Sequence, residues 1–394
     1  MVSQLDKQLH TQPTEVRFCT RCVVSNQRPR TEFDAEGVCN ACLYAEYKKT
    51  IDWDARASAL RALCDKHRSS DGSFDVVVPG SGGKDSGYAA HLLKQEYGMH
   101  PLCVTWAPFE YTDIGWKNFQ DFVKSGFTVL NCFPNGDVHR KLAKIAFEQK
   151  GDALEPFLFG QKAFAFHIAL KWKIPLIFYG ENGEVEYGGS MQNAHKPFES
   201  VSDWEKLYFK GAGVDALLQA GVSEGVFTKE EAKDKTFDLY RTPPLADIQR
   251  LGAEMHWLSY YTKWVPLDNF AYAKKHTGFT PDPDGRTEGT YSNYAGLDDK
   301  SYGFHYYLGY LKFGLGRASR DAMMEIRSGN ITRKEGVELV RKYDGEFPQK
   351  YFPWFLNYLG ITEEEFTKVV DAYRPPHLWE KVGGEWKLKH QVSA

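Results

Sequence analysis

From residue 74 onward the chain alternates short apolar runs with longer segments whose apolar residues have helical spacing. The apolar runs are FDVVV (74–78), PLCVTW (101–106), FTVLNC (127–132) and PLIFYG (175–180). The helical segments are 84–97, 115–126, 137–149 and 157–172. Repeated strand–helix units with short connections predict an α/β fold with a parallel sheet that helices cover on both faces.

The pattern becomes irregular over residues 188–245, where Gly, Ser and Pro are scattered. Helical patterns return at 244–275 and again over 302–373, where SGN (328–330) and YDGEFP (343–348) act as stop signals. We therefore expect three parts. They are an N-terminal four-cysteine module (1–50), the α/β domain (51–245) and a mostly helical C-terminal region for substrate binding or oligomerisation (246–394).

Four of the seven cysteines form two close pairs near the N-terminus. Cys19 and Cys22 make one CxxC pair, and Cys39 and Cys42 make a second one after a gap of sixteen residues. Two such pairs bring four thiolates into the tetrahedral arrangement that a structural Zn²⁺ requires. The segment between the pairs is too polar to form a core, so a metal is its expected organiser. An iron–sulfur centre with the same ligands is the alternative.

Composition narrows the class of protein. The 394 residues are 42% hydrophobic, which is ordinary for a soluble globular protein. Lys and Arg total 49 against 52 Asp and Glu, so a net charge of −3 predicts no nucleic-acid partner. No apolar stretch has the length of a membrane span or a signal peptide, and we expect a cytoplasmic protein without a membrane partner. The isolated Cys64, Cys103 and Cys132 are interpreted as small core residues.

The segment DVVVPGSGGKDS (75–86) places three glycines between a strand and a helix that should begin near Lys84 or Asp85. Glycine lets the backbone approach a ligand, and a helix N-terminus presents N–H groups to phosphate oxygens. Lys84 could neutralise phosphate, Asp85 could hold Mg²⁺, and Ser86 could donate to a phosphate oxygen. A tight turn without a ligand is the alternative.

Residues 81–86, SGGKDS, resemble the SGGxDS loop of the ATP pyrophosphatase (PP-loop) superfamily. This resemblance implies that residues 51–245 are a PP-loop domain, that the loop holds the pyrophosphate part of ATP, and that a carbonyl oxygen is adenylated. The segment GENGEVEYGG (180–189) is similar to acidic segments that face ATP or substrate in related proteins, although its glutamates also suit a solvated loop. The expected catalytic residues are Lys84, Asp85, Ser86 and Glu181. The expected ATP-binding residues are Gly80, Ser81, Gly82, Gly83, Lys84, Asp85, Ser86, Thr105, Gly180 and Asn182, with Asp85 also the ligand of Mg²⁺.

A second resemblance covers about residues 17 to 380. The segments that carry it are CTRC (19–22), CNAC (39–42), the glycine loop, GENGEVEYGG, TEGTYSNYAGLDDKSYGFHYYLGYLKFGLGR (287–317) and ITRKEGVELVRKYDGEFP (331–348). Together they look like the N-acetyl sugar amidotransferases of bacterial surface-polysaccharide and lipopolysaccharide O-antigen biosynthesis. This family implies an AMP-forming ligase. It adenylates an acetamido oxygen of a UDP-activated acetamido sugar or uronic acid and installs ammonia-derived nitrogen, which gives an acetamidino sugar.

Ammonia has to come from a partner. A glutaminase needs a cysteine nucleophile at the mature N-terminus or on a strained elbow. Residue 2 is valine, and none of the three isolated cysteines lies in a glycine-rich elbow. The family resemblance implies separate glutaminase and cyclase-like subunits that supply ammonia to this synthetase. A homo-oligomer through the aromatic-rich C-terminal region is left open.

The C-terminal region offers further polar candidates for substrate binding. The segment 286–292 is rich in hydrogen-bonding groups, and it also suits an exposed loop. The segment Asp298-Asp299-Lys300 could bind a cation or substrate, or its acid pair could simply cap a helix. The expected substrate-binding residues are Glu186, Tyr187, Arg286, Glu288, Thr290, Tyr291 and Asp299.

A row of three arginines and one histidine are interpreted as structural. Arg317, Arg320 and Arg327 have near-helical spacing, and arginines of this kind bind carboxylates or diphosphates. A solvated helix face with internal ion pairs is the preferred interpretation. His305 lies among aromatic residues and is interpreted as a packed side chain rather than a base.

Two other functions compete with the amidotransferase. A tRNA-thiolation enzyme also joins cysteine pairs to this kind of ATP loop, but it needs a reactive cysteine and a basic surface. A non-catalytic nucleotide-binding scaffold is the second rival, and the presence of Lys84, Asp85, Ser86 and Glu181 argues against it.

Overall fold

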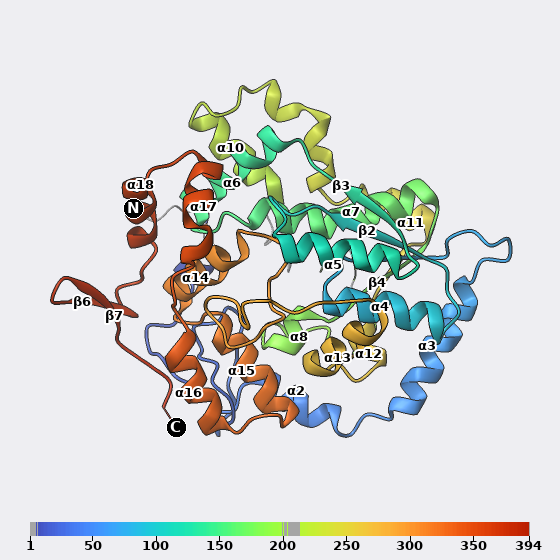
Figure 1. The fold of residues 1–394 in the computed structure, drawn as a ribbon, viewed down its shortest axis with the longest axis horizontal. Coiled ribbons are helices and arrows are strands. Elements are labelled where there is room, and N and C mark those ends of the chain that lie inside the picture. The colour runs from blue at the N-terminus through green and yellow to red at the C-terminus, as the bar shows by residue number, and fades with distance from the viewer. Residues whose placement is uncertain (1–4, 6, 199, 201–202, 204–212, 394) are drawn as a thin grey trace.

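The computed structural model describes residues 5, 7–198, 200, 203 and 213–393, and a five-stranded sheet lies at its centre (Figure 1). The strands run parallel in the order β3-β2-β1-β4-β5. They are β1 (Val76–Pro79), β2 (Pro101–Trp106), β3 (Thr128–Cys132), β4 (Leu176–Tyr179) and β5 (Glu254–Trp257). The mixed α/β architecture with a parallel sheet is therefore confirmed.

Helices cover both faces of the sheet because successive strand residues point into different cores. Val77 packs with α6 (Gly136–Lys150), α7 (Glu155–Trp172) and α10 (Gly213–Ser223) on one face. Its neighbours Val76 and Val78 pack into the second core, to which α3, α4, α5 and α12 contribute. The bounds of these helices are α3 (Trp53–His67), α4 (Lys84–Gln95), α5 (Asp113–Lys124) and α12 (Leu258–Tyr261). Burial on both faces explains the continuous apolar runs of β1, β2 and β4, whereas the edge strand β3 is only partly buried.

The helical reading of 244–275 was wrong at one place, because the fifth strand lies within it. That segment forms α11 (Leu245–Leu251), β5, α12 and α13 (Pro266–His276). The strand EMHW has only four residues, and so short a run has no period that separates a strand from a helix. The irregular stretch 188–245 likewise contains α10 and two 3₁₀ helices among its described residues.

The C-terminal region is mostly helical, as expected. Its helices are α14 (Tyr302–Phe313), α15 (Arg317–Ser328), α16 (Arg333–Tyr343), α17 (Phe352–Leu359) and α18 (Glu363–Ala372). Thr332 and Thr362 each begin a helix with a capping box. A hairpin of β6 (Trp379–Val382) and β7 (Glu385–Leu388), which the sequence reading did not anticipate, turns at Gly383 and Gly384 with positive φ at both.

The N-terminal module packs against the C-terminal helices. It contains α1 (Lys7–His10) and α2 (Asn40–Lys48), and its cysteines share a core with Met323 of α15 and Val337 of α16. Figure 1 shows the blue N-terminal chain beside α15 and α16. The boundaries 1–50, 51–245 and 246–394 stay predictions. Within the described part of the chain, every helix is too short or too polar to cross a bilayer.

The contact of α7 with the sheet gives a test of the fold. Gly160 lies so close to the Trp106 ring that an added Cβ would overlap the indole. We expect Gly160→Ala to destabilise the protein by about 1–3 kcal/mol, as overpacking does elsewhere. Thermal unfolding would show a lower midpoint. Gly136→Ala is the matched control, because nothing lies within 4 Å of its added Cβ at the start of α6; equal midpoints for the two variants would contradict this packing.

Candidate functional site

A cavity of about 670 Å³ opens where the carboxyl ends of β1, β2 and β4 meet the C-terminal helices. The strand order reverses between β1 and β4, because the chain builds β2 and β3 on one side and β4 and β5 on the other. In open parallel sheets this switch point leaves a crevice in which ligands bind. The glycine loop follows β1, and the segment 180–182 follows β4, so both candidate loops reach the same cavity.

The glycine loop has a backbone that only a few residues could adopt. Gly82 has φ of +82°, and an added Cβ would lie 2.8 Å from the carbonyl oxygen of Asn118 in α5. Gly83 is the N-cap of α4 and has no side chain to cap the first turn. The N–H groups of that turn and the positive end of the helix dipole therefore suit an anion in the cavity.

The three polar residues after the loop are held in place by their neighbours. The ammonium of Lys84 lies 2.5 Å from Asp85 Oδ2, and Asn269 Nδ2 donates to Asp85 Oδ1 at 3.0 Å. Ser86 Oγ donates to the carbonyl of Gly83 at 3.1 Å. The Thr105 hydroxyl donates to the carbonyl of Gly80, so its contact supports the loop from β2. Asn269 is a supporting residue that sequence reasoning missed.

Glu181 brings a half-buried carboxyl group to the same place. Burial is the main cause that raises its pKa, and the charge of Asp85 raises it further. The hydroxyl of Tyr187 donates to Glu181 Oε1 at 3.2 Å. Asn182 caps α8 (Gly183–Tyr187) with its side chain, while its N–H donates to Ser259 Oγ. Ten of the predicted site residues thus line one cavity, namely Gly80, Ser81, Gly83, Lys84, Asp85, Ser86, Thr105, Gly180, Glu181 and Tyr187.

Asp298 lines the cavity together with Glu181, although its neighbour Asp299 was the residue predicted to bind substrate. The Asp299 carboxylate accepts hydrogen bonds from the N–H groups of Phe109 and Ser301, both at 2.7 Å. Burial raises the pKa of Asp298, and a hydrogen bond from Ser81 opposes this shift. The loop therefore lies among three carboxyl groups, those of Asp85, Glu181 and Asp298.

The other predicted substrate residues make internal contacts, and none of them is among the described residues that line the cavity. Glu186 pairs with Lys48 at 2.7 Å, and Glu288 accepts from the Lys350 N–H at 3.1 Å. Thr290 donates to Asp321 at 2.6 Å. Burial raises the pKa of Tyr291, the next residue along. Their assignment to substrate binding stays a prediction.

The YDGEFP segment, for which the sequence suggested no role, organises the walls of the cavity. Glu346 accepts two hydrogen bonds from Arg286, at 2.6 and 2.7 Å, and one from the Gly289 N–H. Asp344 accepts from the N–H groups of Gly316 and Ser319 at 3.0 Å and so caps α15. Arg286 is therefore a structural partner of this segment.

Arginine side chains form another part of the cavity wall. Arg317 and Arg320 of α15 reach it, as do Arg28 and Arg30 from the N-terminal module, which sequence reasoning did not consider. The preferred interpretation of a solvated helix face was wrong for Arg317 and Arg320. Arg327 instead donates to the carbonyl of Glu186 at 2.7 Å.

His305 also lines the cavity, and its contacts differ from those of a simple packed ring. Its Nδ1 lies 2.9 Å from Asp152 Oδ2 and 3.0 Å from Oδ1. The contact between Nδ1 and Asp152 fixes the orientation of the imidazole ring, so Nε2 lies on the side of the ring away from Asp152. An imidazole oriented in this way can accept a proton from a bound molecule.

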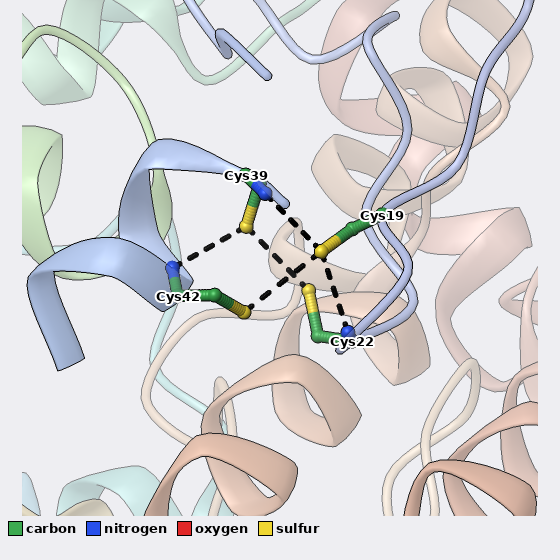
Figure 2. A group of neighbouring side chains, drawn as sticks. All are labelled: Cys19, Cys22, Cys39 and Cys42. Carbon is green, nitrogen blue, oxygen red and sulfur yellow. Dashed lines mark hydrogen bonds between the residues drawn. The ribbon is translucent and has the colours of Figure 1, made fainter. Parts of the chain in front are cut away.

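The four paired cysteines converge on one point (Figure 2). Their Sγ atoms all lie within 4.8 Å of one another, and the Cys19–Cys42 and Cys22–Cys39 pairs are 3.9 and 3.7 Å apart. Tetrahedral Zn–S bonds of about 2.3 Å imply sulfurs about 3.8 Å apart. Backbone N–H groups of Arg21 and other residues of the two CxxC pairs donate hydrogen bonds to the sulfurs, and such bonds stabilise thiolates. The residues therefore fit a zinc ion.

Metal analysis tests this site. We expect about one zinc per chain, since four thiolates complete the coordination of one ion. Cys39→Ser should lose most of the zinc and lower the midpoint of thermal unfolding by several degrees. Cys132→Ser is the control, because Cys132 is outside the cluster. Iron with a visible absorption band, in place of zinc, would contradict the assignment.

Comparison with known proteins gives one result for the C-terminal part. Residues 288–393 match the family model described as "LPS biosynthesis protein WbpG-like, C-terminal domain". No curated protein matches the chain significantly. The matched residues include Asp298, Arg317 and Arg320, which line the cavity together with the glycine loop. The match supports a part for this protein in lipopolysaccharide-related biosynthesis.

Proposed function

We propose that the protein is an ATP-dependent amidotransferase synthetase of the PP-loop type that converts an acetamido group of a nucleotide-activated sugar into an acetamidino group. One observation carries the proposal. The segment that matches a lipopolysaccharide-biosynthesis family and the SGGKDS loop line the same cavity at the switch point of the sheet. A phosphate-binding loop and a sugar-related domain with a shared cavity are what an ATP-dependent reaction on a sugar requires.

In this proposal, the glycine loop holds the pyrophosphate part of ATP. The N–H groups at the start of α4 and the ammonium of Lys84 neutralise the charge that develops on the departing pyrophosphate. The carboxylates of Asp85 and Glu181 would hold Mg²⁺, which supplies Lewis-acid stabilisation of phosphate oxygens. Burial disfavours the charged form of Glu181, and a cation would restore it.

The chemistry then needs no protein nucleophile. The amide oxygen attacks the α-phosphorus and displaces pyrophosphate, which turns a poor electrophile into an imidate with AMP as its leaving group. Ammonia attacks the imidate carbon, the C–O bond to AMP breaks, and a proton leaves the new nitrogen. His305, held by Asp152, lines the cavity as an acceptor for that proton. Ammonia would come from separate glutaminase and cyclase-like subunits.

The cysteine chemistry favours this function over tRNA thiolation. Cys103 lies within β2, where burial raises the pKa of its thiol. Burial also raises the pKa of Cys132 at the end of β3. Thiols that stay protonated are poor nucleophiles and poor sulfur carriers.

The proposal is tested by incubating the protein with Mg-ATP, a high concentration of ammonium and UDP-diacetamido sugars. We expect AMP, pyrophosphate and a sugar product about one dalton lighter, because NH replaces O. High ammonium removes the need for the partner subunits. AMP formation that requires tRNA and a sulfur donor would show a thiolation enzyme instead.

Variants of the loop give the matching mutational test. Lys84→Ala and Asp85→Asn should each lower kcat by about 10²–10³-fold, the usual loss when one electrostatic contact to the transition state is removed. Lys124→Ala is the control, since its side chain is 73% exposed on α5. Unchanged turnover in both loop variants, with unchanged thermal unfolding, would refute the catalytic role of the loop.

A further inference from the structure

Four arginines from two distant parts of the chain line the cavity beside the loop 180–187. Arg28 and Arg30 flank Pro29, between the two cysteine pairs, and Arg317 and Arg320 lie one turn apart on α15. Burial is the main cause that lowers the pKa of Arg28 to about 10. The charge of Glu184 opposes this shift, whereas the charges of Arg320 and Arg30 add to it. The arginines are therefore close enough to repel one another.

Two of these four have carboxylate partners. Arg30 donates to both oxygens of Glu184, at 2.8 and 2.5 Å. Arg317 lies 2.9 Å from Asp321 and donates to the hydroxyl of Tyr306. Their charges are neutralised within the protein, and they hold the cavity wall in place.

Arg28 and Arg320 differ from them, since no carboxylate lies within 4.0 Å of either guanidinium in the described part of the chain. The guanidinium of Arg320 lies 3.9 Å from the centre of the Tyr187 ring. That of Arg28 has a long contact of 3.5 Å with the carbonyl of Pro29. A half-buried guanidinium without an anion is costly, and a protein keeps such groups where a ligand supplies the missing charge.

We propose that Arg28 and Arg320 form a second anion site of the cavity, which binds an oxyanion of the sugar substrate, either its diphosphate or a uronic carboxylate. Tyr187 connects this site to the glycine loop. Its hydroxyl donates to Glu181, and its ring lies against Arg320. A substrate anchored at the arginines would therefore lie beside the carboxyl group that the proposed function places near the reacting phosphate. In naming a sugar nucleotide, the inference rests on that proposed function.

Binding measured without turnover tests the site. Isothermal titration at fixed salt would compare UDP, UDP-N-acetylglucosamine, the corresponding UDP-uronic acid and ATP. Arg28→Met and Arg320→Met should each weaken the UDP ligands by about 10–100-fold, the usual value of a charge-assisted hydrogen bond, and leave ATP within about twofold. Arg250→Met is the control, because its side chain is 77% exposed.

Stability separates a binding role from a structural one. Because neither Arg28 nor Arg320 has a carboxylate within 4.0 Å among the described residues, their replacement by methionine should leave the midpoint of thermal unfolding of the ligand-free protein unchanged or raise it. A fall in the midpoint of both variants, with ligand affinity retained, would assign the arginines to folding and overturn the inference.

The remaining outcomes distinguish the source of the oxyanion. Equally weaker binding of all three UDP ligands to the variants assigns the site to the diphosphate. Weaker binding of the UDP-uronic acid alone assigns it to the carboxylate. Variants that bind the UDP ligands unchanged while AMP is still formed would refute this site alone. Wild-type protein that binds none of the UDP ligands would refute both this site and a UDP-sugar substrate. Arginine-dependent binding without any AMP formation would keep the site and refute the proposed amidotransferase.

Discussion

Two buried carboxylates in the helix that follows β4 determine where the cysteine module lies. Glu184 and Glu186 have side chains only 8% and 3% exposed, and their cations, Arg30 and Lys48, come from the module. Removing one partner of such a pair leaves a buried charge, which costs about 3–5 kcal/mol. These ion pairs therefore stabilise the docking of the module on the segment after β4, and Arg28 of the docked module lines the cavity.

The same argument applies to α15 on the other side of the cavity. Asp344 accepts hydrogen bonds from the first turn of this helix, and burial raises its pKa to about 6 in spite of them. The cap fixes the start of α15, and with it the directions of Arg317 and Arg320. A motif far from the glycine loop thus acts on the site through the position of a helix.

Local signals explain what the sequence could predict. Continuous apolar runs showed four of the five strands, and the glycines of 80–83 marked the loop where the chain leaves β1. The short β5 gave no such signal. The cysteine cluster was predictable because its spacing alone defines the four residues, and the structure brings their sulfurs together.

Tertiary contacts explain what could not be predicted. Asp298 and Asp299 are adjacent in the sequence, and only the docking of their loop against Phe109 turns Asp299 inward and Asp298 toward the cavity. Arg28 lies in a polar segment in which nothing distinguishes it from Arg30, yet Arg30 forms the hydrogen-bonded ion pair with Glu184, whereas Arg28 interacts with that carboxylate at longer range. Local sequence periodicity does not predict ion pairs between residues so far apart along the chain.

Tyr187 contacts both the carboxyl group of Glu181 and the guanidinium of Arg320 in the cavity wall. Its hydroxyl donates to Glu181, while Arg320 lies 3.9 Å from the centre of its ring. The hydroxyl of Tyr187 is a hydrogen-bond donor to the carboxyl group, and its ring presents a π face to the guanidinium. Each group thus has a favourable neighbour without an ion pair between them. A direct ion pair would stabilise the empty cavity and compete with both a cation at Glu181 and an anion at Arg320. Keeping them apart leaves a carboxyl group for a cation and a guanidinium for an anion within one cavity.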